Sequence, residues 1–250
     1  MTAEDDRRAG PPGVAAADGY AGYVEWKGWT GRFAADTRNA RYFAAEFRGI
    51  ELAGKRLLEI GFGDGGFLAW ARAAGAEVRG IELDAGLCIA GRRAGFDVTA
   101  ATLAELAAGG TAFDVIVALD VLEHWDHSEL VANLRHIQTL LRDGGLFLAR
   151  FPNGQSPYGR IYQHGDFSHR TTLSTYRIEY LAQLTGLDVV RIDNACRVSS
   201  HTGVLPALRQ HWLAWRRRRI ERHIARLYGI RRLPLDPNLV AVLRKPRAAT

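Results

Sequence analysis

Residues 57–68 read Leu-Leu-Glu-Ile-Gly-Phe-Gly-Asp-Gly-Gly-Phe-Leu. An apolar run leads into a glycine-rich turn and apolar residues resume beyond it, which is the pattern of a strand, a tight turn and a helix start. Glycine lets the backbone adopt conformations that a Cβ forbids and approach a bound molecule closely. The stretch therefore predicts a strand-turn-helix unit whose turn contacts a ligand.

Strand-like and helix-like runs alternate along the chain on either side of this turn. The strand-like runs are residues 56–60, 77–82, 96–99, 113–119, 146–151, 187–192 and 239–243. Helical patterns separate most of them, and strands that alternate with helices build a parallel sheet. Residues 113–119 are apolar on both faces after Asp114, as expected for a buried central strand. We predict an α/β fold with a seven-stranded, mostly parallel sheet and helices on both faces.

The chain divides into three parts by composition. Residues 1–19 mix charges, prolines and alanines without an apolar period, which predicts a disordered tail. Residues 20–53 carry aromatic side chains at three- to four-residue spacing, which predicts one or two helices that either cap the sheet or form a lid over the site. Residues 54–250 form the main domain, with an insertion at 204–232 before the last strand.

The composition, with 47% hydrophobic and 24% charged residues in a chain of 250, is that of a soluble globular protein. The sequence contains no apolar run long enough to span a bilayer, and its first residues lack the hydrophobic segment of a signal peptide. The two cysteines, Cys88 and Cys196, lie far apart, which argues against a disulfide framework or a zinc knuckle. We expect a cytoplasmic location.

The glycine turn by itself fits two classes of cofactor. Gly61, Gly63 and Gly66 match the G-x-G-x-x-G pattern of dinucleotide-binding domains. Glu82 follows Gly61 by 21 residues, where the ribose of either cofactor requires a carboxylate.

Three further features make residues 54–151 resemble the class I S-adenosylmethionine-dependent methyltransferases, which have a Rossmann-like fold. Glu59 precedes the glycines in an E-x-G-x-G-x-G pattern, which implies that it orients the methionine end of the cofactor. Residues 80–84, Gly-Ile-Glu-Leu-Asp, look like the second motif of the family, in which Glu82 binds the ribose hydroxyls and Leu83 packs on adenine. Residues 113–124 end in Asp-Val-Leu-Glu-His, a strand-four signature that dehydrogenases do not share.

The resemblance implies S-adenosylmethionine as the cofactor. The residues implied to bind it are Glu59, Gly61, Phe62, Gly63, Gly65, Glu82, Leu83, Thr102, Leu103 and Asp120. In similar proteins the turn after strand three ends in an acid that binds the adenine amino group, and Thr102 stands in that place here. Adenine recognition is therefore expected from backbone groups or from the Thr102 hydroxyl.

Histidines at the same predicted sheet edge are candidates for a general base, since a hydroxyl acceptor must lose its proton and a pKa of ~6.5 suits that task. His124 follows strand four, and two more histidines lie in the polar loop 152–174 after strand five. The catalytic candidates, with His169 as the first choice and His124 as the second, are His169, His124, Asp120, His164 and Asp166.

The acceptor class comes from a second resemblance. Residues 165–169, Gly-Asp-Phe-Ser-His, together with Leu173 and Ser174 look like the G-D-x-T-H…F-T segment of methyltransferases linked to bacterial surface-polysaccharide and lipopolysaccharide synthesis. This implies methyl transfer to a hydroxyl of a sugar, or of a glycan or glycolipid precursor, by in-line displacement. A cofactor-binding module without methyl transfer is a different alternative.

A route that uses a divalent metal stays open. Asp120, Glu123 and His124 are similar in spacing to the ligands of some metal-dependent methyltransferases that act on small RNA or polyprenyl catechols. Together with a loop histidine they would form a site with oxygen and nitrogen ligands for Mg²⁺ or a transition ion. The same string occurs in members without a metal, where it lines the pocket. We expect that no metal is required. The alternative function is O-methylation of a polyprenyl catechol or an RNA 2′-hydroxyl with a bound metal.

Positive charge is concentrated in residues 204–232, which carry +8 in a chain of formal net charge +6. An apolar side of the predicted helix is formed by Trp212, Trp215, Ile220, Ile224 and Leu227. Either this side packs on the domain, or the helix contacts an anionic partner. We predict contact with an anionic membrane, at its inner face, through Arg216, Arg217, Arg218 and Arg219. A nucleic-acid partner is not expected, because no RNA-binding domain is recognisable, and the oligomeric state is left open.

Overall fold

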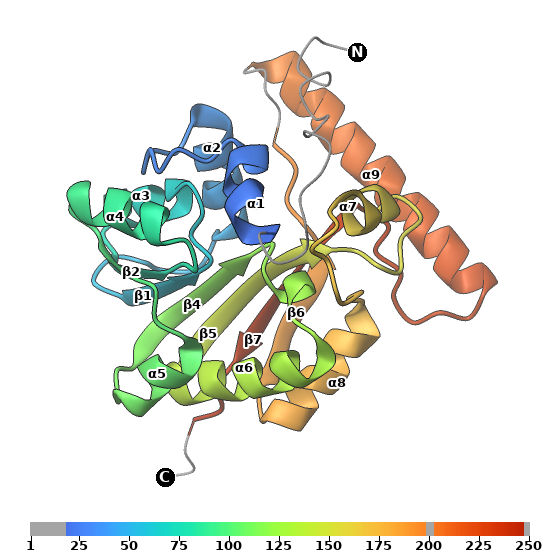
Figure 1. Cartoon of the computed structure of the whole chain (residues 1–250). Coiled ribbons are helices and arrows are strands. Elements are labelled where there is room, and N and C mark those ends of the chain that lie inside the picture. Colours follow the sequence, from blue (N-terminus) through green and yellow to red (C-terminus); the bar gives the residue numbers. More distant parts are fainter. Residues whose placement is uncertain (1–18, 199–202, 248–250) are drawn as a thin grey trace.

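The computed structural model describes residues 19–198 and 203–247 (Figure 1). A seven-stranded sheet runs through them in the order β3-β2-β1-β4-β5-β7-β6. Strand β7 is antiparallel to both of its neighbours, and the other pairs are parallel. The strands are β1 (Arg56–Ile60), β2 (Glu77–Ile81), β3 (Asp97–Thr99), β4 (Phe113–Leu119), β5 (Leu141–Pro152), β6 (Asp188–Asn194) and β7 (Asn238–Arg244). The predicted seven-stranded, mostly parallel sheet is confirmed.

Helices cover both faces of the sheet (Figure 1). They are α1 (Gly19–Lys27), α2 (Thr37–Glu46), α3 (Gly66–Ala73), α4 (Ala85–Arg93), α5 (Leu103–Ala108), α6 (His127–Leu140), α7 (Arg160–Gly165), α8 (Thr175–Thr185) and α9 (Val204–Leu227), with a 3-10 turn at Leu122–His124. None of the helices within the described ranges is long and apolar enough to cross a bilayer.

Two apolar cores lie on opposite sides of the sheet, because successive strand residues alternate between its faces. In β4, Ile116 and Ala118 face the core formed with α5, α6 and α8, while Val115 and Val117 face the core formed with α2 and α3. The rigid sheet thereby fixes the loops at its carboxyl edge.

The segment that precedes β1 is anchored by α2. Phe43 and Phe47 pack against Phe67 of α3, the first edge-on and the second tilted, with ring centroids 5.1 Å apart in each case. The buried carboxylate of Glu46 accepts hydrogen bonds from Arg191 and from the Cys196 backbone amide, which ties α2 to β6 and the residues after it. These contacts keep the N-terminal segment close to the main domain.

Element boundaries agree with the prediction to within a few residues, with three differences. Strand β5 begins at Leu141, five residues before the predicted start. The loop predicted at 152–174 contains α7, whose six residues are too few to give a helical period. The helix predicted within 204–232 ends at Leu227. The predicted tail, residues 1–19, lies outside the described residues except for Gly19.

The structure does not show the first of the two alternatives for α9, packing on the domain through its whole Trp/Ile side. Trp212, Trp215, Ile220 and Leu227 are 52%, 51%, 48% and 68% exposed. The half-buried face that meets the domain includes Leu213, Arg217, Glu221 and Ile224 instead. Hydrogen bonds of Glu221 fix which face of α9 meets the domain, because its carboxylate accepts from Asn194 and from the Leu235 amide. In Figure 1, α9 lies along the outside of the fold.

Candidate functional site

The candidate residues lie at the point in the sheet, between β1 and β4, where the order of the strands changes direction. Strands β1 and β4 are neighbours, while β2 and β5 lie on their outer sides, so the loops after these strands diverge from one edge. Open α/β sheets bind ligands in such a crevice at the carboxyl ends of their strands. The glycine turn after β1, Glu82 after β2 and Asp120 to His124 after β4 all lie here.

The glycine turn is covered by residues of the N-terminal segment. Gly65 has a φ of +72°, and a Cβ there would lie 2.3 Å from the ring of Phe33. A Cβ on Gly63 would approach the ring of Trp29 to 3.0 Å. The Asp64 carboxylate accepts from the backbone amides of Thr30 and Arg32 and so holds this cover in place. The glycines are therefore required for packing of the chain on itself, and their contact with a ligand remains a prediction.

Two buried carboxylates flank the turn. Glu82 accepts from the amides of Gly63, at 3.0 Å, and Leu83, at 2.7 Å. Glu59 is buried, and within the described part of the chain its Oε2 atom has no hydrogen-bond partner. Burial and the nearby charge of Glu82 raise the pKa of Glu59 well above its usual range. An acceptor left unpaired in this way fits the ammonium group of an amino-acid ligand.

The other predicted cofactor residues differ in their surroundings. Leu83 is 72% exposed beside Glu82, as required of a residue that packs on a ligand, whereas Leu103 and Phe62 are buried in the protein core. The Thr102 hydroxyl donates to Glu105 and accepts from its amide, as the N-cap of α5. That hydroxyl is already used in capping, which favours backbone groups for adenine recognition. The roles of all these residues toward the cofactor remain predictions.

Asp120 is paired with Arg150 of β5. The guanidinium binds both carboxylate oxygens of Asp120, and it also lies 5.1 Å from the ring centroid of Tyr42. Asp120 itself has a φ of +58°, a left-handed conformation that Asp tolerates better than most residues. An arginine within the otherwise apolar stretch 146–151 was the sequence signal for this pair.

His169 is buried and held by the backbone. Its Nδ1 atom lies 3.1 Å from the carbonyl oxygen of Gln163. A carbonyl only accepts, so Nδ1 carries the proton and Nε2 keeps its lone pair in the neutral ring. Nε2 lies 3.8 Å from both Glu123 Oε1 and Asp166 Oδ2. Burial lowers the pKa of His169, which keeps the ring neutral near pH 7.

His124 is oriented by a chain of two hydrogen bonds that runs through Ser168 to Asp166. Its Nδ1 atom lies 3.1 Å from Ser168 Oγ, and that hydroxyl donates to Asp166. Because the Ser168 proton is used on Asp166, Nδ1 of His124 is the donor and its Nε2 atom is also left with a lone pair. The two imidazole centroids are 4.8 Å apart, and burial followed by the charge of His169 lowers the pKa of His124.

Helix α1 closes the site from above the histidines. The Tyr23 hydroxyl donates to Asp166 at 3.1 Å, and Lys27 Nζ lies 3.0 Å from the same carboxylate. The Tyr23 ring also contacts His124, with centroids 5.8 Å apart. Burial raises the pKa of Asp166, but the hydrogen bond from Ser168 and the proximity of Lys27 outweigh it and hold that pKa at about 2.

Glu123 is a buried carboxyl without a hydrogen bond. Among the described residues, neither of its oxygens has a partner, and its side chain is 1% exposed. Burial and the charge of Asp120 raise its pKa well above the usual range. Together with His124 and His169 it forms a group whose ligand atoms all lie within 4.8 Å of one another.

The structure thus brings together most, but not all, of the predicted catalytic residues. His169, His124 and Asp166 are in contact, while His164 lies exposed on α7. The sequence analysis missed Tyr23, Lys27, Ser168 and Arg150. Tyr23 and Lys27 stand some 140 residues before Asp166, and no local pattern linked them to it.

Comparisons with known proteins show the family of the chain and agree with its fold. The chain matches a family described as a methyltransferase domain over residues 31–233. No curated protein matches its sequence. A methyltransferase from Archaeoglobus fulgidus that depends on S-adenosylmethionine has a TM-score of 0.58 at 20% identity, covering 82% of this chain and 90% of its own. An S-adenosylmethionine-dependent methyltransferase from Mesorhizobium loti has a TM-score of 0.56 at 17% identity, covering 82% of this chain and 97% of its own.

A third similar structure was solved with a relative of the cofactor. The N-methyltransferase NodS from Bradyrhizobium japonicum, in complex with S-adenosyl-L-homocysteine, has a TM-score of 0.52 at 14% identity, covering 83% of this chain and 85% of its own. At these identities the solved structures establish the fold, while the family match covers most of the chain. The chain belongs to the methyltransferase-domain family and is a class I methyltransferase that uses S-adenosylmethionine.

Proposed function

We propose that this methyltransferase modifies a hydroxyl of a sugar, in a bacterial surface glycan or glycolipid precursor, with His169 as the general base. The observation that carries the proposal is the bond from His169 Nδ1 to the Gln163 carbonyl, which leaves Nε2 as a proton acceptor. A hydroxyl becomes a strong nucleophile only as its proton leaves, so a neutral imidazole is the group that it needs.

Each residue of the site has a separate role in the proposed reaction. When bound, the cofactor supplies an electrophilic methyl group on a sulfonium, and Glu59 and Glu82 are the residues that would hold its methionine and ribose parts. His169 accepts the proton of the attacking hydroxyl at Nε2. Asp166, ionised at neutral pH and 3.8 Å from Nε2, stabilises the imidazolium that results. Lys27 and Tyr23 hold Asp166 in that position.

The N-terminal segment 20–53 acts as a lid in this proposal. Its Tyr23 and Lys27 contact the catalytic group, and its Trp29 lies on the glycine turn. A cover of this kind excludes water and strengthens electrostatic interactions beneath it.

An amphipathic acceptor is supported by exposed side chains near His169. Phe167, two residues before it, is 104% exposed, and Tyr158 and Ile161 beside and within α7 are 62% and 76% exposed. Contiguous patches of exposed apolar side chains mark binding surfaces, and these three residues lie within ten positions of one another in the chain. Together with the resemblance of residues 165–169, they favour a glycan that carries an apolar portion.

The test is transfer of a labelled methyl group. The protein is incubated with methyl-labelled cofactor and a pool of bacterial glycans and glycolipid precursors, and mass spectrometry locates the label. We expect a labelled sugar hydroxyl with the wild type and with His164→Ala, and loss of label with His169→Ala. Label on a nitrogen atom or on RNA would contradict the proposed acceptor.

A metal-dependent O-methylation of a polyprenyl catechol or an RNA 2′-hydroxyl is the second candidate. The observation that favours it is the group of Glu123, His124 and His169, in which both Glu123 oxygens lack a hydrogen-bond partner among the residues that the structure describes. Two nitrogens and one carboxylate suit a transition ion better than Mg²⁺, which prefers oxygen. Asp120, predicted as a ligand, is bound by Arg150, and His169 takes its place in this group.

A further inference from the structure

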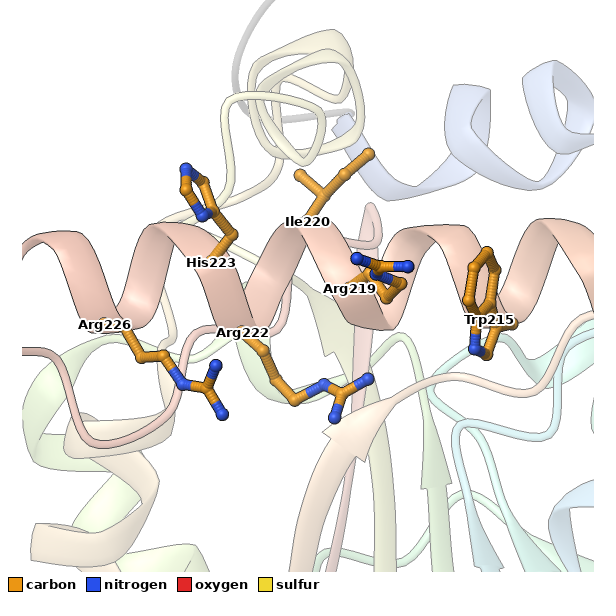
Figure 2. Close-up of a pocket in the computed structure, with 6 residues that line it drawn as sticks. All are labelled: Trp215, Arg219, Ile220, Arg222, His223 and Arg226. Carbon is orange, nitrogen blue, oxygen red and sulfur yellow. The ribbon is translucent and has the colours of Figure 1, made fainter.

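The outward face of α9 is divided along its length into an apolar half and a basic half. The apolar half, at the N-terminal end, exposes Leu205 (80%), Leu208 (61%), Trp212 and Trp215. The basic half exposes arginines at helical spacing, namely Arg216, Arg219, Arg222 and Arg226, and Arg209 and Arg218, elsewhere on α9, are exposed as well. Figure 2 shows Arg222 and Arg226 extending in the same direction from the helix, along a groove that starts at Trp215.

Charge on this face is of one sign. Glu221 is the one acid of α9, and it is turned inward to Asn194 and Leu235. Arg217 is also turned inward and lies 3.6 Å from Asp236, so it takes no part in the outward face. The sequence-based grouping of Arg216 to Arg219 as one exposed set is therefore wrong at Arg217.

The two halves are joined by arginine-tryptophan pairs. The guanidinium of Arg216 lies 4.9 Å from the ring of Trp212, and that of Arg219 lies 4.9 Å from the ring of Trp215. Tryptophan and arginine both favour the boundary between lipid headgroups and acyl chains. Both arginine-tryptophan pairs therefore suit a helix that lies flat in this boundary.

We propose that α9 docks on an anionic lipid bilayer, with Leu205, Leu208, Trp212 and Trp215 inserted at the interface and the four outward arginines bound to headgroup phosphates. An RNA partner would use the arginines, but the two exposed leucines would have no use against a phosphodiester backbone. The bilayer matches both halves of the face. The proposal does not depend on the acceptor of the methyl group.

Docking there would orient the catalytic loop. The Leu235 amide donates to Glu221 of α9, while the Leu235 carbonyl accepts from Ser156 at 2.6 Å. Asn153 Nδ2 donates to the carbonyls on either side of Leu235. Residues 153–159 lead into α7 and on to the loop of His169, so the site is held at a fixed position relative to the docking helix.

Vesicle sedimentation tests the proposal with the full chain. Vesicles of phosphatidylcholine are compared with vesicles of equal parts phosphatidylcholine and phosphatidylglycerol, at low and high ionic strength. We expect binding to the anionic vesicles alone, and its loss as the Debye length falls from ~30 Å to ~3 Å. Each basic residue near an anionic surface strengthens binding by about 5-fold, so R216Q/R219Q/R222Q/R226Q should bind ~10²–10³-fold more weakly.

Two further variants separate charge from contact. The control R38Q/R48Q/R93Q/R135Q removes the same number of charges from exposed positions on other parts of the fold. It should bind the vesicles as the wild type does, apart from the small loss that the lower net charge causes. W212A/W215A keeps the charge and should still weaken binding. Circular dichroism and cofactor binding verify the fold of each variant. No binding to any vesicle, equal binding to both kinds, equal loss in the control, or a preference for RNA would overturn the proposal.

Discussion

The Nε2 atom of His169 lies 3.8 Å from Oε1 of Glu123, so a neutral base and a buried carboxyl face each other in the site. The raised pKa of Glu123 favours its protonated form when no cation is near, and a cation would reverse that preference. The pair therefore separates the two proposed chemistries. A proton acceptor requires only the histidine, whereas a metal requires both groups.

Replacement of His169 by alanine should lower turnover by ~10²–10⁴-fold, because the proton acceptor is lost. Cofactor affinity should stay within a factor of about two, since His169 contacts residues after β4 and β5 and not the glycine turn. Single-turnover kinetics and calorimetry measure the two quantities. His164→Ala is the matched control, an exposed histidine on α7 that should leave turnover unchanged. A fully active His169→Ala enzyme would transfer the role to His124.

The pH dependence should follow the neutral form of the base. Burial lowers the pKa of His169, so turnover should rise with pH, with a midpoint below ~6.5, and be constant through neutrality. The negative charge of Asp166 opposes that lowering, hence Asp166→Asn should move the midpoint to still lower pH. A pH-rate profile of each protein gives the midpoints. A midpoint above neutrality in the wild type would exclude His169 as the base.

Removal of divalent ions tests the metal directly. With a histidine base alone, EDTA should leave turnover unchanged, and Glu123→Gln, which keeps the shape of a neutral carboxyl, should keep most of it. With a bound metal, EDTA should abolish turnover, Mn²⁺ should restore it, and Glu123→Gln should lower Mn²⁺ affinity by ~10-fold or more. Calorimetry of the protein with Mn²⁺ measures that affinity without any acceptor.

The sequence predicted the parts of this molecule that local chemistry determines. The alternation of apolar strands and helices predicted the sheet, and the glycines with Glu59 and Glu82 predicted the cofactor edge. The contacts of Tyr23 and Lys27 with Asp166 were not predictable, because they join residues that lie some 140 positions apart in the chain. The rotation of α9 was missed for a different reason. Its inward face is fixed by hydrogen bonds of Glu221, whereas the sequence pattern points only to the apolar residues.

Glu59→Gln should separate cofactor binding from folding stability. Loss of the Glu59 charge should weaken the binding of S-adenosylmethionine by ~1.5–3 kcal/mol, the range for a hydrogen bond to a charged group. The unliganded protein should be as stable or more stable, because Oε2 of the buried carboxylate has no hydrogen-bond partner within residues 19–198 and 203–247. Calorimetry and thermal unfolding measure these two effects. Glu77→Gln, at an exposed position on β2, should change neither, and unchanged affinity in Glu59→Gln would mean that the carboxylate only packs.

Thr102→Ala should act in the opposite sense. The Thr102 hydroxyl accepts from the Glu105 amide at 3.2 Å and donates to the Glu105 carboxylate at 2.9 Å. The same carboxylate accepts from the Thr102 amide at 2.7 Å, which closes the capping box of α5. Loss of an N-cap of this kind costs ~0.5–2 kcal/mol of stability, so the midpoint of denaturant unfolding should fall. Cofactor affinity should not change, since the hydroxyl is already used within the helix cap and adenine is left to backbone groups. Thr102→Ser, which keeps the hydroxyl, should behave as the wild type in both measurements. If Thr102→Ala instead weakens the cofactor more than it destabilises the fold, the hydroxyl leaves the cap to bind adenine, and the acid that the family uses at this place has been replaced by a neutral partner.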